Sequence, residues 1–281
     1  MKYFNIILIF SLLTSCEFQQ KEQSSPEEQN QLKRETSSIT FQPIEQLATD
    51  FKFTEGPAPD ENGNVYFTDI PEAKIYIWTN SNELELFREN SGGANGLFFD
   101  KADQLFVCEG YAGRVSMTSP EGKQKVIADS FNDKRFNQPN DVWVHPNGDV
   151  YFTDPYYGAE ENITPQDGMH VYVVKKLDNS IFQVTNDLVK PNGLIGTPNG
   201  KKIYITDQSA NKTFCYDIEE KGMLSNKRLF IDAGGDGMTM DKQGNIYLTN
   251  NGKMAIEIFV RRRSFCKFKV SSKLFNRLEC Y

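Results

Sequence analysis

The sequence predicts an all-β protein in which four-stranded sheets repeat around one axis, the architecture of a β-propeller. A turn-and-strand pattern recurs five times, and the aromatic residues at its centre lie 40 to 53 residues apart. The segments between the repeats lack the periodicity of an amphipathic helix, which excludes a βαβ fold. The net charge of −7 argues against nucleic acid as a partner.

The N-terminal segment predicts export. Lys2 is followed by a short apolar run over residues 4–13 and by Leu13-Thr14-Ser15-Cys16. The run is too short to span a bilayer. Because it resembles the lipobox of bacterial lipoproteins, we expect a signal peptide over 1–16, a lipid on Cys16 and a cell-envelope location facing the periplasm or the exterior. An ordinary signal peptide, which would release the protein, is the alternative.

Residues 17–40 predict a disordered tether, because they are rich in Gln, Glu, Ser and Lys and poor in large apolar residues. We expect the propeller domain over residues 41–252 and a monomer. The cysteines beyond Cys16 form no C-x-x-C pair, so neither a zinc ribbon nor a disulfide framework is indicated.

Each repeat combines a polar turn with an alternating apolar strand, as one buried face requires. The repeats are DENGNVYFTD from 60, DKADQLFVCEG from 100, HPNGDVYFTD from 145, TPNGKKIYITD from 197 and DKQGNIYLTN from 241. Their central aromatics are Tyr66, Phe106, Tyr151, Tyr204 and Tyr247.

A second regularity predicts the site. Eleven or twelve residues before each central aromatic stands an oxygen-bearing side chain, and the five are Glu55, Asn95, Asn140, Asn192 and Asp236. Each precedes a short apolar segment that we expect to form the innermost strand of its sheet. Side chains at the equivalent position of every sheet lie on one ring around the axis. Turn capping, a common use of Asn-Gly and Asp-Gly, is the alternative, but it does not explain Glu55.

Carboxylates that converge in a partly dehydrated channel repel one another unless a cation lies between them. Ligands that offer oxygen, with neither thiolate nor imidazole, favour a hard divalent ion such as Ca²⁺. Zn²⁺ and Mg²⁺ remain alternatives. The sequence has two histidines and no G-x-S-x-G motif, so it offers little for a Ser-His-Asp triad.

At these residues the sequence resembles the family of senescence marker protein 30, gluconolactonase and the lactone-responsive proteins. The similar segments are FTEGPAPDENGNVYFTD, GGANGLFFD, FNQPNDVWVHPNGDVYFTDPYYG, KPNGLIGTPNGKKIYITD and GDGMTMDKQGNIYLTN. The resemblance implies a six-bladed propeller with one divalent metal in its channel. It assigns the metal ligands to Glu55 of EGP, Asn140 of PND, Asn192 of PNGL and Asp236 of DGM.

The resemblance also implies the reaction, hydrolysis of a small lactone or ester. The ion would polarise the carbonyl, and Asp236 would serve as the catalytic base. Asn95 and Arg135 match substrate-contact positions, and Tyr156 lies in the longest loop expected at the channel mouth. A solvated loop and an ordinary surface arginine are the alternatives. Other functions left open are a non-catalytic ligand-binding propeller, an inactive relative and a phosphotriesterase.

The C-terminal segment departs from the repeats. Residues 253–281 carry eight Lys and Arg against two Glu, and they contain two of the five cysteines. We expect an aberrant basic tail in place of the last blade, and therefore weak or absent activity of this chain. A genuine basic tail that binds anionic lipid is the alternative.

Overall fold

The computed structural model describes residues 46–158, 164–250, 255–260 and 263–269, with side chains up to residue 249 outside the gap at 159–163. The chain divides into two units, Met1–Gln42 and Pro43–Tyr281, and every described residue belongs to the second. The predicted signal peptide, Cys16 and the tether therefore lie outside the described residues.

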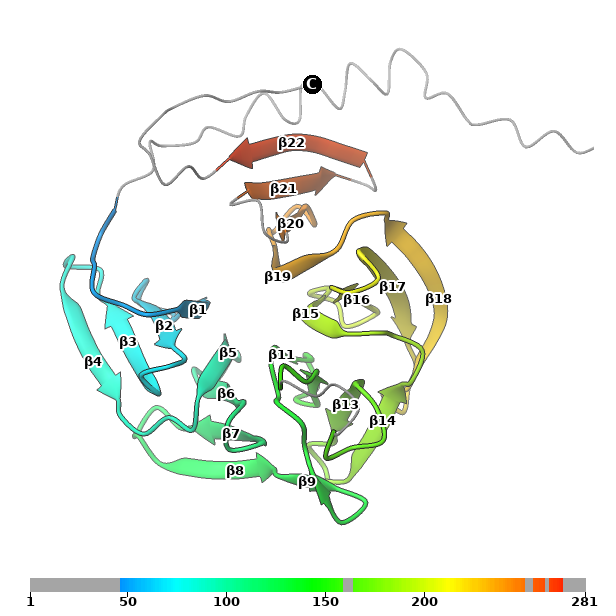
Figure 1. Ribbon diagram of the computed structural model, residues 1–281, viewed down its shortest axis with the longest axis horizontal. Helices are drawn as coiled ribbons and strands as arrows, with labels where there is room; N and C mark the ends of the chain where they lie inside the picture. Colours follow the sequence, from blue (N-terminus) through cyan, green and yellow to red (C-terminus); the bar gives the residue numbers. More distant parts are fainter. Residues whose placement is uncertain (1–45, 159–163, 251–254, 261–262, 270–281) are drawn as a thin grey trace, which may run out of the picture. The chain divides into compact units, whose positions relative to one another are not determined.

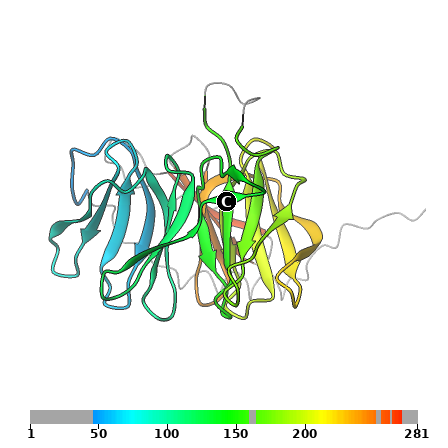
Figure 2. The ribbon, with the colours of Figure 1, turned by 90° about the horizontal axis from the view of Figure 1, so that it is seen from below.

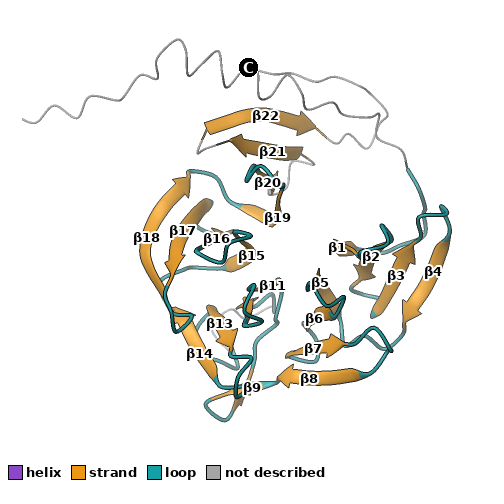
Figure 3. Cartoon of the chain, turned by 180° about the vertical axis from the view of Figure 1, so that it is seen from behind, coloured by secondary structure: helices purple, strands orange, loops and turns teal. Residues whose placement is uncertain are grey.

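The described residues form strands and no helix (Figure 3), so the predicted all-β class is confirmed. In this part of the chain no helix is long and apolar enough to cross a membrane. Five antiparallel sheets have four strands each, and β9 (Ser130–Phe131) and β10 (Lys134–Arg135) form a separate hairpin.

Each sheet uses four strands that follow one another in the sequence. The first contains β1 (Thr54–Pro59), β2 (Val65–Asp69), β3 (Lys74–Trp78) and β4 (Leu84–Arg88). The second contains β5 (Ala94–Phe99), β6 (Leu105–Glu109), β7 (Arg114–Thr118) and β8 (Gln124–Ala128). The third contains β11 (Val142–Val144), β12 (Val150–Asp154), β13 (His170–Val174) and β14 (Ile181–Thr185).

The remaining two sheets have the same order. The fourth contains β15 (Pro191–Gly196), β16 (Lys202–Asp207), β17 (Lys212–Ile218) and β18 (Leu224–Ile231). The fifth contains β19 (Gly235–Met240), β20 (Ile246–Asn250), β21 (Ala255–Val260) and β22 (Arg263–Lys269).

Within the second unit the five sheets lie around a common axis, with the first strand of each innermost (Figure 1). Seen from the side, the sheets stand next to one another like blades (Figure 2). The innermost strands neighbour one another in the order β1, β5, β11, β15 and β19. This is the propeller arrangement that the repeat predicts, and the described residues supply five of its blades.

The core lies between adjacent sheets. Ile75 and Val107 pack between the first and second, Phe136 and Tyr172 between the second and third, and Tyr151 with its neighbours between the third and fourth. β6, β12 and β13 are buried along their whole length, as expected for strands covered on both faces.

The fifth sheet extends beyond the predicted domain boundary at residue 252. β21 pairs with β20 and β22 pairs with β21, so the first part of the basic segment supplies two strands. The physical reason is the content of β-branched and aromatic residues in AIEIFV and RSFCKFK, since such residues favour a strand whatever the net charge of the segment. Residues 270–281 lie outside the described part.

Candidate active site at the propeller axis

Four of the five predicted ring residues lie at β-bulges in the innermost strands, and the fifth, Asn140, precedes β11, which has no bulge. The register with the second strand shifts between Glu55 and Ala58 in β1, and at the equivalent place in β5, β15 and β19. Asn95, Asn192 and Asp236 lie inside these shifts. A bulge bends the strand and redirects a side chain, and bulges are frequent beside active sites. The regular spacing of these residues in the sequence therefore reflects a bulge that recurs in the backbone.

An aspartate at the end of the second strand holds the chain that leads into the bulges of β1 and β15. The carboxylate of Asp69 accepts hydrogen bonds from the backbone N–H groups of Lys52 and Phe53 at 3.0 and 3.1 Å. Asp207 accepts the N–H groups of Val189 and Lys190 at 2.7 and 3.0 Å. The repeated Thr-Asp ending of the second strand thus positions the ring residues.

Three predicted ligands are in direct contact. Asn192, which is buried, donates from its Nδ2 to Oδ1 of Asp236 at 2.7 Å. The carboxyl group of Glu55 lies close to that of Asp236, close enough for Asp236 to raise the Glu55 pKa. The structure therefore brings side chains of β1, β15 and β19 together at the axis.

Burial and crowding of negative charge perturb these acids. Desolvation, followed by the charge of Asp236 and the hydrogen bond to it, raises the pKa of Glu55 to about 8. Desolvation also raises the pKa of Asp141 to about 7, against backbone hydrogen bonds from Leu194 and Val142 that lower it. A cation between the carboxylates would offset the repulsion between them.

Asn140 and Asn95 hold the same phase in the third and second sheets. Asn140 is buried, and its backbone oxygen accepts the N–H of Gly96 at 2.7 Å. Asn95 is partly buried, and its backbone oxygen accepts the hydroxyl of Thr68 at 3.1 Å. The backbone of both residues is thus fixed by contact with the neighbouring sheet.

Asp141 is a site residue that the sequence analysis missed. One of its carboxylate oxygens accepts the N–H of Leu194 in the next sheet at 2.9 Å, and its charge contributes to the raised pKa of Glu55. A signal was present in the sequence. Glycine follows the ring residue in four repeats, whereas Asp141 follows Asn140 in the third.

The glycines that follow the ring residues lie against the next innermost strand. A Cβ atom on Gly56 would be 2.1 Å from the backbone oxygen of Asn95, and one on Gly193 would be 2.7 Å from that of Asp236. Only glycine permits such an approach. Gly237 in β19 differs, because a Cβ atom there would meet only the Thr249 Oγ1 at 4.0 Å. Among the described residues, β19 and β1 are joined by the Glu55–Asp236 contact rather than by strand packing.

Tyr157 and Gln208 also reach the site, and the sequence pattern did not identify Gln208. The Tyr157 hydroxyl accepts from Asn192 Nδ2 at 2.7 Å and donates to Gln208 Oε1 at 3.3 Å. Gln208 Nε2 lies 3.4 Å from Asp236 Oδ1. Tyr156, the predicted substrate contact, is partly buried next to Gly158, and the contact with the ligands belongs to its neighbour Tyr157.

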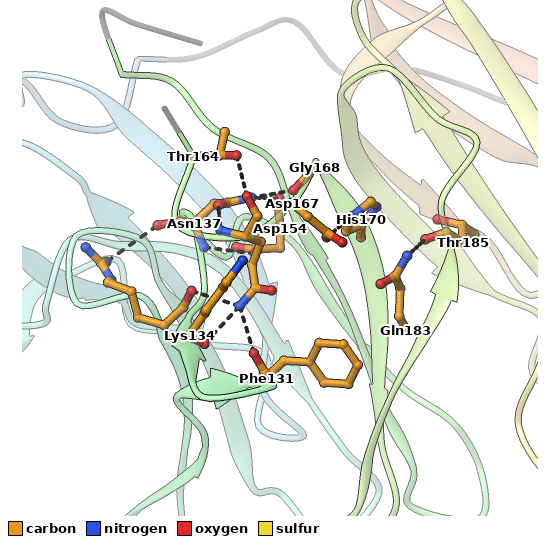
Figure 4. Close-up of polar contacts among 12 residues, drawn as sticks. Phe131, Lys134, Asn137, Asp154, Thr164, Asp167, Gly168, His170, Gln183 and Thr185 are labelled. Atoms are coloured by element: carbon orange, nitrogen blue, oxygen red, sulfur yellow. Dashed lines mark hydrogen bonds and ion pairs between the residues drawn. The ribbon is translucent and has the colours of Figure 1, made fainter. Parts of the chain in front are cut away.

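Arg135 belongs to a polar network outside the ligand cluster. Its exposed guanidinium donates to the backbone oxygen of Tyr111 at 3.1 Å. The buried side chain of Gln166 donates to the backbone oxygens of Lys134 and Arg135, and its own N–H donates to Asn137 (Figure 4). This network holds the β9–β10 hairpin to the segment that precedes Asn140.

The two histidines have structural partners. His145 Nε2 lies 2.9 Å from the backbone oxygen of Gly200 in a turn between strands. His170, at the start of β13, contacts Asp167 at 3.0 Å and is drawn in Figure 4. Neither contact involves the ligand cluster.

The donor set fits a hard divalent cation. Glu55, Asn140, Asn192 and Asp236 offer carboxylate and amide oxygens, the ligands that Ca²⁺ and Mg²⁺ prefer. Among the described residues no group of three His, Cys, Asp or Glu side chains is arranged to hold a metal, so the amides would be needed to complete the coordination. The paired carboxyls at the axis are the feature that a cation would stabilise.

Comparison with known proteins assigns the fold and the relatives. The family model described as the SMP-30/gluconolactonase/LRE-like region matches residues 53–266. A gluconolactonase from Zymomonas mobilis is 29% identical over 252 residues, covering 76% of this chain and 69% of the relative. The lactonase drp35 from Staphylococcus saprophyticus is 23% identical, covering 72% of this chain and 61% of the relative.

A solved structure supports the same fold. The calcium-binding protein regucalcin from Agrobacterium tumefaciens superposes with a TM-score of 0.66 at 19% identity, covering 80% of this chain and 77% of the other. At this identity the similarity shows the fold alone.

Proposed function

This chain belongs to the SMP-30/gluconolactonase/LRE-like family, and from this premise we propose that it is a metal-dependent hydrolase of a small lactone or ester. The observation that carries the proposal is the meeting of three predicted ligands at the axis, where Asn192 donates to Asp236 at 2.7 Å and Glu55 lies beside Asp236. Relatives that act on lactones, a gluconolactonase and a lactonase, support the substrate class.

We propose that Glu55, Asn140, Asn192 and Asp236 hold one divalent cation, with Ca²⁺ favoured over Zn²⁺ and Mg²⁺. The choice of Ca²⁺ rests on the hard oxygen donors. Such an ion would supply Lewis-acid polarisation of the substrate carbonyl. The protein residues orient the substrate and move the proton. Asp236 would accept the proton of the attacking water.

Substrate contacts beyond the ligands are assigned to the mouth of the channel. Asn95 lies on the same ring as the ligands. Arg135 lies on the segment that leads into the third sheet, and Tyr156 follows β12 within that sheet. Amide and guanidinium donors at these places suit the hydroxyl groups of a sugar lactone.

A lactone panel tests the proposal. Proton release from sugar lactones would be followed with the calcium-loaded protein, with chelated protein and with the Asp236→Asn variant. We expect turnover in the first sample alone, and we expect it to be weak, because the described residues form five of the six blades that the resemblance implies. Turnover that is insensitive to both chelator and substitution would contradict the proposal. Lactone binding without turnover in wild-type and variant alike would instead indicate a non-catalytic binding propeller.

We further propose that the chain acts as a monomer anchored by lipid on Cys16 at the bacterial cell envelope, because one chain supplies the proposed ligand set and the N-terminal sequence resembles a lipobox. Metabolic labelling with a fatty-acid probe tests the anchor. Labelling should require Cys16 and disappear in Cys16→Ser, and an unlabelled, fully released wild-type protein would contradict it.

A further inference from the structure

The hydrogen bonds around Asn192 form a closed ring of four side chains. Asn192 Nδ2 donates to Tyr157 Oη and to Asp236 Oδ1, both at 2.7 Å. The Tyr157 hydroxyl donates to Gln208 Oε1 at 3.3 Å, and Gln208 Nε2 donates to Asp236 Oδ1 at 3.4 Å. The donors and acceptors are consistent around the whole ring.

The ring determines which atom of the Asn192 side chain is available. A carboxamide has two N–H donors and one oxygen acceptor, and it can bind a cation only through the oxygen. Tyr157 and Asp236 accept from the Nδ2 group, so the amide nitrogen is held away from the remaining space. With the nitrogen engaged, the oxygen is the atom through which the Asn192 side chain can bind a cation.

Gln208 stabilises the same arrangement from the other side. It lies directly after Asp207, whose carboxylate holds the backbone of Val189 and Lys190, and its own N–H donates to the backbone oxygen of Lys190 at 2.9 Å. The backbone of Gln208 is thus fixed to the segment that leads to Asn192. Its side chain can then supply both a donor and an acceptor to the ring.

The position of Tyr157 is also constrained at both ends. Its backbone N–H donates to the side chain of Gln138, and the Lys190 ammonium lies 4.9 Å from the centre of its ring. A cation above an aromatic face is attracted to it. These contacts bring the hydroxyl from the segment after β12 to an amide in β15.

We propose that Tyr157 and Gln208 are positioning residues that orient Asn192 and Asp236 for cation binding. The inference rests on the proposed function, and it assigns to these two side chains a role in metal affinity. Residues that orient metal ligands typically change affinity 10- to 100-fold when they are removed. Neither residue need touch the substrate for this effect.

Calcium titration calorimetry on the full chain tests the inference. Tyr157→Phe removes only the hydroxyl, and Tyr66→Phe is the matched control because Tyr66 packs against Phe87 and Phe99 in the first sheet, away from the ring. We expect Tyr157→Phe to weaken calcium binding about 10-fold or more. Tyr66→Phe should bind as the wild type does.

A second variant keeps the test independent of the folding of the first. Gln208→Met has a similar volume without the amide, and it should weaken calcium binding to a comparable extent. Since both residues act through one ring, the double variant should lose much less than the product of the two single losses. At saturating calcium, the kcat of each variant should return to within about threefold of the wild-type value. A general structural defect would not show this recovery.

The outcomes separate the two proposals. If the wild type binds calcium and both variants bind it equally well, the positioning role is overturned while the metal site stands. If the wild type binds no divalent cation in a titration with Ca²⁺, Mg²⁺ and Zn²⁺, the proposed metal site fails, and the positioning role fails with it.

Discussion

Two glutamates in neighbouring sheets, one buried and one partly buried, are stabilised in opposite ways. Glu109, at the end of β6, is 1% exposed and contacts Arg88 Nη2 at 2.7 Å, Arg114 Nε at 2.6 Å and the hydroxyl of Ser116. Glu55 in β1 shares a hydrogen bond with another acid, Asp236, and its pKa rises to about 8. Arginine side chains of the protein neutralise Glu109, whereas Glu55 has to be neutralised by a proton or by a bound cation.

The difference indicates which cluster is structural and which is functional. A carboxylate that is paired with two guanidinium groups has no need of a ligand, and its role is to hold strands together. Perturbed acids that crowd around an axis are the arrangement expected of a binding or catalytic site. The same substitution, Glu to Gln, should therefore have opposite consequences in the two clusters.

The largest expected effect is the loss of metal binding in Glu55→Gln. Removing one of the charged ligands should weaken calcium binding about 1000-fold, because calcium affinity in proteins depends strongly on the number of charged ligands. The metal-free variant should be at least as stable as the wild type, since a repulsive acid is gone. Calorimetry and urea unfolding with chelator measure both quantities. Unchanged calcium affinity would remove Glu55 from the ligand set.

Glu109→Gln should instead lower stability and leave the metal site intact. The substitution leaves Arg88 buried without its charged partner, which typically costs about 3–5 kcal/mol in the free energy of unfolding. Urea unfolding should show the loss, and the folded fraction should bind calcium with wild-type affinity. A loss below about 1 kcal/mol would mean that the cluster is not a structural ion pair.

The pH dependence of the metal-free protein provides a third comparison. The pKa of Glu55 is about 8 in the folded state against 4.5 without the fold, so the native state binds more protons between these values. The free energy of unfolding should therefore fall as pH rises from about 4.5 to 8. Asp141, with a pKa of about 7, acts in the same direction. Urea unfolding with chelator would measure the slope, which should be smaller in Glu55→Gln. A stability that rises with pH throughout this interval would contradict the assignment.

The smallest effect is expected for Arg114→Lys. Its side chain is 40% exposed, and its partner Glu109 keeps Arg88 and Ser116. Partly exposed ion pairs contribute little, so the loss should stay below about 1 kcal/mol. Equal losses for Arg114→Lys and Glu109→Gln would show that the exposed guanidinium carries most of the stabilisation.

The sequence predicted the fold and part of the site because both repeat. The phase shared by Glu55, Asn192 and Asp236 follows from a bulge that recurs in the innermost strands. Asp141 could not be predicted from the repeat, because the other four repeats have glycine at this position. Its contact with Leu194 depends on the neighbouring sheet.

Two further parts of the structure could not be predicted from the repeats, the loop residues of the site and the last two strands. Gln208 and Tyr157 lie outside the strands, where no periodicity constrains the direction of a side chain. In the basic segment, β-branched and aromatic residues form β21 and β22 although the segment carries a net positive charge. Net charge is a poor indicator of strand formation, whereas β-branched and aromatic content is a better one.

The position of Gly237 has a consequence for how the ring responds to its ligand. Where the other ring glycines press against a neighbouring strand, β19 meets β1 chiefly through two acidic side chains. Part of the binding free energy of a cation would then be the energy that closes the circle of sheets. Cation binding should then slow amide hydrogen exchange in β1 and β19. The fully buried β12 and β13 would exchange slowly with or without the cation.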